Sequence, residues 1–162
     1  MAETTPTRSV TAKTRKSTKR DYIYAVGRRR EAVARVRLHT SLKESYKWGE
    51  HDIVANQILV NEMPVEKYFP GSLAKASYMH PIKVTGVDGN YAFTIKLAGG
   101  GKKSQLDAMI HGISRALAKI EKKKHRPALK EKGLLTRDPR VRERRKVGTG
   151  GKARRKKQSP KR

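Results

Sequence analysis

The stretch SQLDAMIHGISRALAKI, residues Ser104–Ile120, decides the fold because it predicts one long helix with a single buried face. Its large apolar residues recur at spacings of four, three, four and three, the period of one side of an α-helix. They are Leu106, Ile110, Ile113, Leu117 and Ile120. Ser104 and Asp107 have the spacing of a capping box, which predicts the start of the helix at Ser104. The opposite face carries Gln105, His111, Gly112, Arg115 and Lys119.

The segments before this helix predict a sheet on which the helix packs. Ala32–Leu38 alternates strictly, so one face is apolar and the other is cationic through Arg35 and Arg37. Further strand-like segments are Tyr22–Val26, Ile53–Asn61, Ile82–Thr85 and Tyr91–Leu97, the last with Tyr91, Phe93, Ile95 and Leu97 on one face. Polar residues Ser41–Asp52 predict a hairpin loop, and Asp88–Gly89 predicts a tight turn joining the last two strands.

Short helices are predicted between and after these strands. Pro64 opens one whose apolar side is Val65, Tyr68 and Phe69. Ser72 caps a second that runs through Met79 and is stopped by Pro81. The long helix ends at Lys122–Lys124, and Pro127–Gly133 adds one short helical turn. The fold class is therefore α+β: a two-layer sandwich of a four- to five-stranded mixed sheet with helices on one face, followed by a long extended basic C-terminal tail.

The formal net charge of +26 is concentrated at the two ends of the chain. Residues 134–162 contain thirteen basic and two acidic side chains and few apolar ones, so this segment cannot build a core of its own. We expect a disordered basic N-terminal arm over 1–20, a globular domain over 21–121, a basic helical connector over 122–133 and the extended tail over 134–162. Such a tail needs a dense source of negative charge to become ordered, and the backbone of a nucleic acid provides one.

Composition and motifs argue against an enzyme. There is no cysteine, and the five histidines are scattered without metal-ligand spacing. Gly99–Ser104 departs from the phosphate-binding loop of NTPases because Lys96 stands where the first glycine is required. We expect no catalytic residues, metal, cofactor, small-molecule substrate or membrane. The first twenty residues also have the composition of an organellar transit peptide, but a basic arm is favoured because Val10 is their only large aliphatic residue after Met1.

Basic residues, with two glycines and Gln105, are the candidate nucleic-acid contacts in two regions, the domain and the tail. In the domain they are Arg28, Arg29, Arg30, Arg35, Arg37, Gly100, Gly101, Lys102, Lys103, Gln105, His111 and Arg115. In the tail they are Arg137, Arg140, Arg142, Arg144, Arg145, Lys146, Arg154 and Arg155. Glycines before a helix and beside two lysines suit a phosphate, but the spacing fits a plain strand-to-helix turn equally well. Arginine forks match phosphate oxygens, and the tail lacks aromatic residues for stacking on bases.

From Tyr24 onward the chain resembles the bacterial form of the small-subunit ribosomal protein nine family. The matching stretches are VGRRREAVARV (26–36), LVNEMPVEKYF (59–69), GGGKKSQLDAMIHGISRAL (99–117), LLTRDPRVRERRK (134–146) and ARRKKQSPKR (153–162). The resemblance implies a cytoplasmic ribosomal protein on the head of the small subunit, bound to its rRNA and beside other head proteins. It also implies that the terminal Lys161 and Arg162 reach the peptidyl-site tRNA.

Two other function classes remain as alternatives to a ribosomal protein. The first is a histone-like, DNA-compacting protein, since Ser159–Pro160–Lys161–Arg162 resembles the basic units of chromatin tails. It occurs once rather than as a repeat. The second is an enzyme acting on RNA, which is disfavoured because the sequence shows no acid/base or metal constellation. An organellar ribosome is a less favoured setting than a cytoplasmic one.

Overall fold

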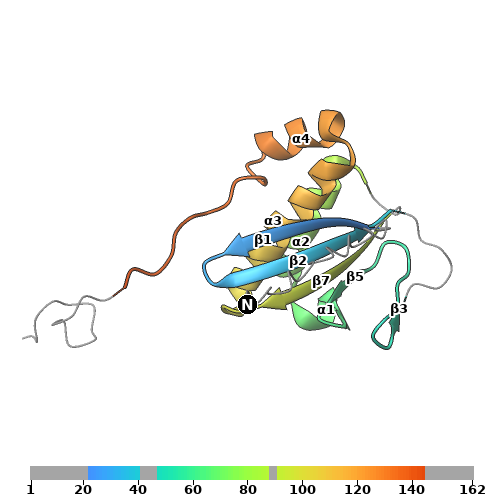
Figure 1. The fold of residues 1–162 in the computed structure, drawn as a ribbon, viewed down its shortest axis with the longest axis horizontal. Helices are drawn as coiled ribbons and strands as arrows, with labels where there is room; N and C mark the ends of the chain where they lie inside the picture. The colour runs from blue at the N-terminus through green and yellow to red at the C-terminus, as the bar shows by residue number, and fades with distance from the viewer. Residues whose placement is uncertain (1–21, 41–46, 88–90, 145–162) are drawn as a thin grey trace, which may run out of the picture.

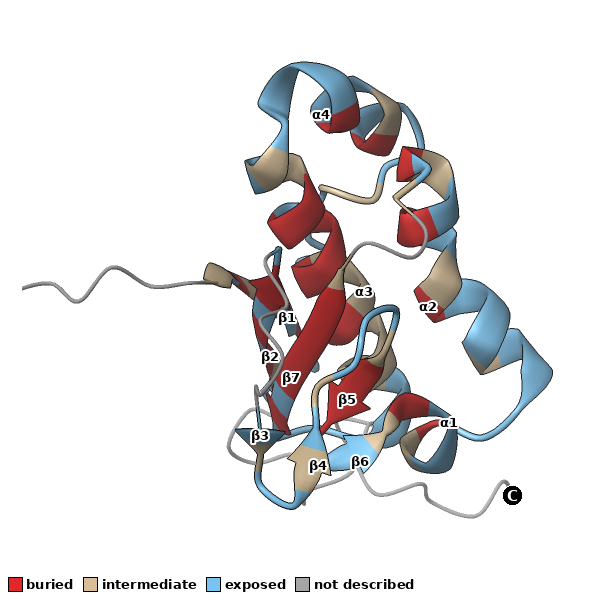
Figure 2. Cartoon of the chain, turned by 90° about the vertical axis from the view of Figure 1, so that its right-hand side faces the viewer, coloured by how far each residue is buried: buried red, intermediate tan, exposed pale blue. Residues whose placement is uncertain are grey.

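The structure, a computed structural model, describes residues 22–40, 47–87 and 91–144 (Figure 1). A five-stranded sheet has the strand order β1-β2-β7-β5-β6, and helices cover one of its faces (Figures 1 and 2). The sheet consists of β1 (Tyr22–Arg29), β2 (Ala32–His39), β7 (Ala92–Ala98), β5 (Ile58–Val60) and β6 (Met63–Pro64). The helices are α1 (Val65–Tyr68), α2 (Ser72–Thr85), α3 (Lys102–Ile120) and α4 (Lys122–Glu131). This confirms the predicted α+β fold with a mixed sheet; the predicted tail beyond Arg144 and arm over 1–20 lie outside the described residues.

Strand β2 forms the centre of the core, as its alternation predicted. Ala32, Ala34, Val36 and Leu38 are fully buried, while Arg35 and Arg37 are exposed. In β7, Phe93, Ile95 and Leu97 are buried in the same apolar cluster. The antiparallel register puts Val36 beside Ile95 and Leu38 beside Phe93, so both strands present one apolar face to α3.

Two glycines allow α3 to lie directly on the sheet. A β-carbon on Gly27 would lie 1.9 Å from the carbonyl oxygen of Ala108, and one on Gly112 would lie 2.7 Å from the side chain of Val36. Any larger residue at either position would push the helix away from β1 and β2. The prediction that Gly112 belongs to the polar face of α3 was therefore wrong.

The predicted apolar stripe of α3 is present, but the helix starts earlier than expected. Ile113 and Leu117 are fully buried, whereas Leu106, Ile110 and Ile120 are half-buried at the margins. Ala108, Met109 and Ala116 complete the buried face. The predicted capping box is absent: the N-cap is Gly101 and makes no side-chain cap hydrogen bond. Asp107 instead lies within ion-pair distance of Arg29.

The connection after β2 is not a hairpin between neighbouring strands, because β7 lies between β2 and β5. Strand β5 pairs with β7 in parallel, with Val60 beside Ile95. The predicted strand over Ile53–Asn61 is reduced to β5. Within the predicted loop Ser41–Asp52, β3 (Lys47–Trp48) and β4 (His51–Asp52) form a separate small hairpin. Residues 41–46 lie outside the described part of the chain.

Helix α2 continues through Pro81, contrary to the prediction that Pro81 ends it. Its N-cap is Gly71 rather than Ser72, and the helix ends at Gly86 in the left-handed conformation. A proline inside a helix costs roughly 3 kcal/mol. Here that cost is offset because Tyr78, Pro81 and Ile82 are buried against the core. The predicted strand Ile82–Thr85 and its hairpin with Tyr91–Leu97 are therefore wrong, and the predicted turn residues Asp88–Gly89 are not described.

Helix α4 begins at Lys122, five residues before the predicted helical turn at Pro127. Glu121, in an extended conformation, separates it from α3. Leu129 is fully buried and holds the helix on the core. A Schellman motif ends α4: Gly133 (φ +68°) donates to the Lys130 carbonyl at 3.0 Å, and Leu134 donates to the Leu129 carbonyl at 3.0 Å. This motif turns the chain so that Leu134 and Leu135 pack against the core. No helix in the described ranges has both the length and the apolarity needed to span a bilayer.

Candidate nucleic-acid interface

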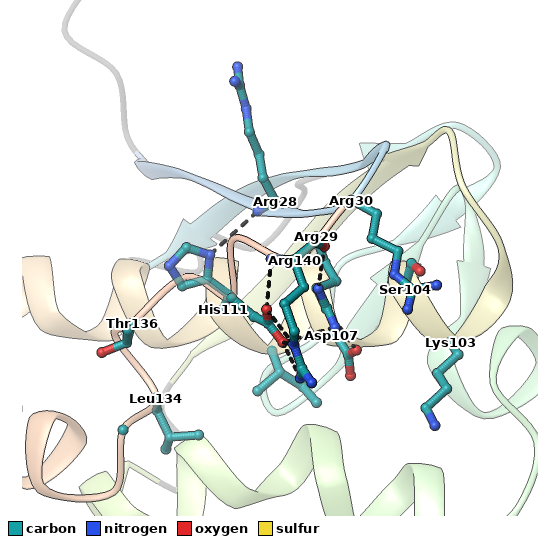
Figure 3. A pocket seen from close by; sticks show the side chains of 13 residues that line it. Arg28, Arg29, Arg30, Lys103, Ser104, Asp107, His111, Leu134, Thr136 and Arg140 are labelled. Atoms are coloured by element: carbon teal, nitrogen blue, oxygen red, sulfur yellow. Dashed lines mark hydrogen bonds and ion pairs between the residues drawn. The ribbon is translucent and has the colours of Figure 1, made fainter. Parts of the chain in front are cut away.

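The three consecutive arginines after Gly27 point in different directions (Figure 3). Arg28 is exposed and lies on the open face of the sheet, opposite the helices. Arg29 is 9% exposed and faces α3. Arg30 is exposed in the β1–β2 turn, with a positive φ of 51°. Strand alternation therefore separates Arg28 from Arg29, and the turn gives Arg30 a third environment.

Arg29 joins the strand, the long helix and the C-terminal segment. Its guanidinium lies 2.9 Å from Asp138 and 3.6 Å from Asp107, and it donates to the carbonyl of Arg140 at 2.8 Å. Sequence reasoning grouped Arg29 with the candidate RNA contacts. In the structure its hydrogen-bonding capacity is largely used within the protein. Asp138, one of the two acids of the tail, is the partner that the charge count alone did not reveal.

Asp138 is also held by Arg140, two residues further along the chain. The Arg140 side chain donates to both carboxylate oxygens, at 2.6 to 3.0 Å, and its backbone NH donates to one of them at 2.9 Å. These hydrogen bonds, with the charges of Arg140 and Arg29, hold the pKa of Asp138 well below its usual range. The carboxylate is thus ionised at any physiological pH and keeps the segment from Leu134 to Arg140 on the domain.

His111 links the same segment to the edge of the sheet. Its Nδ1 accepts a hydrogen bond from the backbone NH of Arg28 at 3.4 Å. Burial, and then the nearby charges of Arg115 and Arg137, lower its pKa against the opposing effect of a hydrogen bond with the backbone of Leu135. The imidazole is therefore neutral at pH 7, as acceptance at Nδ1 requires. His111 was predicted as an RNA-facing residue; the structure places it half-buried between β1 and the C-terminal segment.

These contacts enclose a groove, here called the tail-root groove, between the β1–β2 turn, the start of α3 and residues 133–140 (Figure 3). Cations at its margin are Arg30, Lys103 and Arg140, while the Arg28 side chain points away toward the open face. Its two acids, Asp107 and Asp138, both lie within ion-pair distance of Arg29. The groove therefore presents an excess of positive charge, suited to phosphate groups.

The glycine-rich turn before α3 is a close-packed corner of the fold. Gly99 and Gly100 have positive φ angles of 72° and 62°. A β-carbon on Gly99 would lie 2.5 Å from the carbonyl oxygen of Glu31, so the turn lies against the β1–β2 turn. Gly101 has open space around it and a φ of −101°. The residues form a strand-to-helix turn between β7 and α3.

Three of the other predicted RNA contacts on α3 have partners within the protein. The Lys102 ammonium lies 3.4 Å from the centre of the Tyr68 ring. Gln105 accepts from the Tyr68 hydroxyl at 2.8 Å and donates to the Gly99 carbonyl at 3.0 Å. Arg115 donates to the carbonyl of Val26. Lys119, which was not among the predicted contacts, donates to the carbonyl of Tyr24 at 2.6 Å. Arg115 and Lys119 thus cover the outer edge of β1.

The open face of the sheet forms a second basic surface. It is lined by side chains of β1, β2 and β7 and by Trp48 of the β3–β4 hairpin. Arg35 lies between Val26 and Lys96, and Arg37 lies between Tyr24 and Thr94. The alternation of β2 predicted Arg35 and Arg37 here. Lys96 and Trp48 were missed, although the same alternation in Tyr91–Leu97 places Lys96 opposite the apolar face.

The described part of the tail adds further exposed cations. Arg137, Arg140, Arg142 and Arg144 are all exposed, and residues 137–144 have no regular secondary structure. The remaining predicted contacts lie outside the described residues: Arg145, Lys146, Arg154, Arg155, Lys161 and Arg162.

Comparison with known proteins agrees with this arrangement. The sequence profile described as "Ribosomal protein S9/S16" matches residues 27–162. The chain belongs to the ribosomal protein S9/S16 family. Bacterial S9/S16 relatives named "Small ribosomal subunit protein uS9" are similar over most of the chain. The protein from Maridesulfovibrio salexigens is 41% identical over 82% of this chain and 91% of its own length. The protein from Porphyromonas gingivalis (strain W83) is 40% identical over 79% of this chain and 89% of its own length.

Membership of the S9/S16 family confirms the resemblance noted in the sequence. It also agrees with the prediction that the protein is not an enzyme, since the family consists of structural ribosomal proteins. A third S9/S16 relative, from Cutibacterium acnes, is 39% identical over 76% of this chain. The aligned region spans 64% of that protein's length. The family disfavours the histone-like alternative, whose single Ser-Pro-basic unit falls within the matched range.

Proposed function

We propose that this protein is a structural component of the small ribosomal subunit that binds small-subunit rRNA. The proposal is supported by the S9/S16 family match and by relatives named as small-subunit proteins. The structural observation that carries it is the tail-root groove, where Arg29 lies within ion-pair distance of both acids, Arg140 also binds Asp138, and Arg30 and Lys103 are exposed. RNA backbone supplies closely spaced phosphates, the complement of such a surface.

The contacts we propose with rRNA come from the groove, the glycine turn, the open face of the sheet and the tail. Arg30, Lys103 and Arg140 bind phosphates at the groove, while Arg29 holds the groove in shape. Arg35 and Arg37 bind on the sheet, and the basic residues of 137–155 follow the rRNA away from the domain. On this view the domain over 21–121 and the connector over 122–133 carry a tail that is ordered by RNA, and 1–20 is a basic arm.

The finer role we propose is contact with tRNA. Lys161 and Arg162 reach the anticodon stem-loop of the peptidyl-site tRNA, and the domain sits on the subunit head beside other head proteins in a cytoplasmic ribosome. The support is the resemblance of the terminal segment, residues 153–162, to the end of the family, and the density of basic residues that leads to it.

Salt dependence of rRNA binding tests the first part of the proposal. If about six cations contact phosphates, affinity for a fragment of the rRNA head domain falls roughly a thousandfold between about 50 and 200 mM salt. The double variant Arg30→Glu/Lys103→Glu should bind more weakly and with a smaller salt slope. Lys123→Glu/Lys130→Glu on α4 makes the same change in charge away from the groove. Affinity that is insensitive to salt, or equal loss in both variants, would refute the groove as the rRNA site.

Truncation tests the second part. Ribosomes carrying a chain that lacks Gln158–Arg162 should assemble normally and bind tRNA in the peptidyl site more weakly. The matched control is a chain lacking Thr5–Ser9, an equal number of residues from the other end. Unchanged tRNA affinity in purified truncated ribosomes would exclude the terminal contact while leaving rRNA binding intact.

A further inference from the structure

The open face of the sheet combines cations with aromatic rings, and nothing in the proposed function yet requires the rings. Tyr24 is the most exposed aromatic residue of the sheet, at 37%. It lies directly across β1–β2 from Arg37. Trp48, the only tryptophan of the chain, lines the same face from the β3–β4 hairpin and is half-buried. Tyr24 and Trp48 thus bring two aromatic rings to the surface that carries the cations.

The cations of this face come from three neighbouring strands. Arg35 and Lys96 are paired across β2 and β7, Arg37 follows Arg35 at the next alternate position of β2, and Arg28 lies on β1. Paired positions on neighbouring strands lie about 5 Å apart, and alternate positions along a strand about 7 Å apart. The side chains therefore present several guanidinium and ammonium groups over a nearly flat area of a few strands.

These charges are not neutralised within the described part of the chain. The residues that line the face include four cations, Arg28, Arg35, Arg37 and Lys96, and no acid. No ion pair found among residues 22–40, 47–87 and 91–144 involves any of the four. Arg37 lies over the ring of Tyr22, with its guanidinium carbon 5.2 Å from the ring centre. The partner of this face must be anionic.

We propose that the open face binds an unpaired segment of RNA, with phosphates on Arg28, Arg35 and Lys96 and bases stacked on Tyr24 and Trp48. Unpaired nucleotides offer both phosphates and free base faces, and a sheet carrying aromatic and basic residues matches both. A duplex offers phosphates but keeps its bases stacked internally, and an acidic protein segment offers charge without flat rings. The inference rests on the proposed function and adds the kind of RNA structure that this face recognises.

The single tryptophan allows a local test with the full-length protein. A single-stranded RNA decamer of mixed sequence is titrated while Trp48 fluorescence and the anisotropy of a dye on the RNA are both recorded. Stacking should quench Trp48, and a duplex of the same sequence should bind without comparable quenching. Tyr24→Ala should raise the RNA concentration for half-maximal quenching by about tenfold, within the range for loss of one base–aromatic stack.

Charge reversal on the sheet provides the second part of the test. Arg35→Glu/Lys96→Glu should abolish the quenching, whereas Lys123→Glu/Lys130→Glu on α4 should preserve it. If anisotropy reports salt-sensitive binding while Trp48 fluorescence is unchanged, this inference is wrong and the proposed function stands. If the RNA does not bind at all, both this inference and the proposed function are wrong. Equal quenching by the duplex, or quenching by a polyglutamate peptide of equal charge but not by RNA, would also overturn it.

Discussion

The backbones of Gly27 and Gly112 lie against each other where α3 crosses β1. A β-carbon on Gly27 would lie 2.4 Å from the amide nitrogen of Gly112, closer than any real contact between such atoms. Because both neighbours are backbone, the overlap cannot be relieved by a change of side-chain rotamer. The helix and the strand therefore depend on each other for their positions, and the groove at the end of β1 depends on both.

We expect Gly27→Ala to lower the free energy of unfolding by more than about 3 kcal/mol, because the helix must move off the sheet. Gly101→Ala provides the control, since Gly101 has no heavy atom within 4 Å of its virtual β-carbon and an ordinary φ of −101°. Its effect should stay within about 1 kcal/mol. Urea denaturation followed by circular dichroism measures both. Similar stability of the two variants would contradict the close packing.

The second prediction concerns how residues 134–140 are held on the domain. Asp138→Asn removes the negative charge that Arg29 and Arg140 share, so residues 134–140 should exchange their amide hydrogens faster. Glu143→Gln removes the same charge from an exposed tail position that takes part in none of the ion pairs found in the described ranges. Hydrogen–deuterium exchange with mass spectrometry compares them. Unchanged protection in Asp138→Asn would show that Leu134 and Leu135 hold the segment without the ion pair.

Acid should destabilise the protein below pH 6.5, the ordinary pKa of histidine. Burial, with help from Arg37, lowers the pKa of His39, and burial with Arg115 lowers that of His111. The unfolded chain then binds protons that the folded chain rejects, so the free energy of unfolding falls as the pH drops from 6.5 through the lowered pKa values. His39→Gln/His111→Gln should flatten this dependence in denaturation experiments from pH 5 to pH 8. If the free energy of unfolding changed equally with pH in the original protein and in the double variant, the prediction would be contradicted.

Helix α3 protects an edge of the sheet, and removing that protection should cause association. Arg115 and Lys119 bond to the carbonyls of Val26 and Tyr24. In Arg115→Ala/Lys119→Ala these groups become available to a second chain, and we expect concentration-dependent self-association. Lys123→Ala/Lys130→Ala removes the same charge from the exposed surface of α4. Light scattering after size-exclusion chromatography distinguishes the two; a monomeric edge variant would show that the remaining structure protects β1.

The elements that could be predicted from the sequence are those whose local pattern and tertiary packing agree. The alternation of Ala32–Leu38 and the spacing of Ile113 and Leu117 report directly on burial, so β2 and α3 were found. Pro81 was misread because its local penalty is outweighed by contacts with distant residues, which no local pattern records. The parallel pairing of β5 with β7 was missed for the same reason.

The candidate site was predicted in composition but not in arrangement. Counting charges identified the basic residues, yet it treated Arg28, Arg29 and Arg30 as equivalent. Strand alternation through Tyr22–Arg29 would have separated Arg28 from Arg29. The partnership of Arg29 with Asp138 could not be predicted, because the two are far apart in the chain and meet only when α4 and the Schellman motif at Gly133 return the segment to β1.

Anchoring the segment 134–140 to Arg29 also has a kinetic consequence. Once any part of the domain has touched a large polyanion, the basic residues that follow Arg140 start from a fixed point beside it rather than from bulk solution. Their engagement becomes an intramolecular event with a high effective concentration, and release requires several such tethered contacts to open together. A protein built in this way would dissociate slowly from the polyanion even where each individual contact is weak.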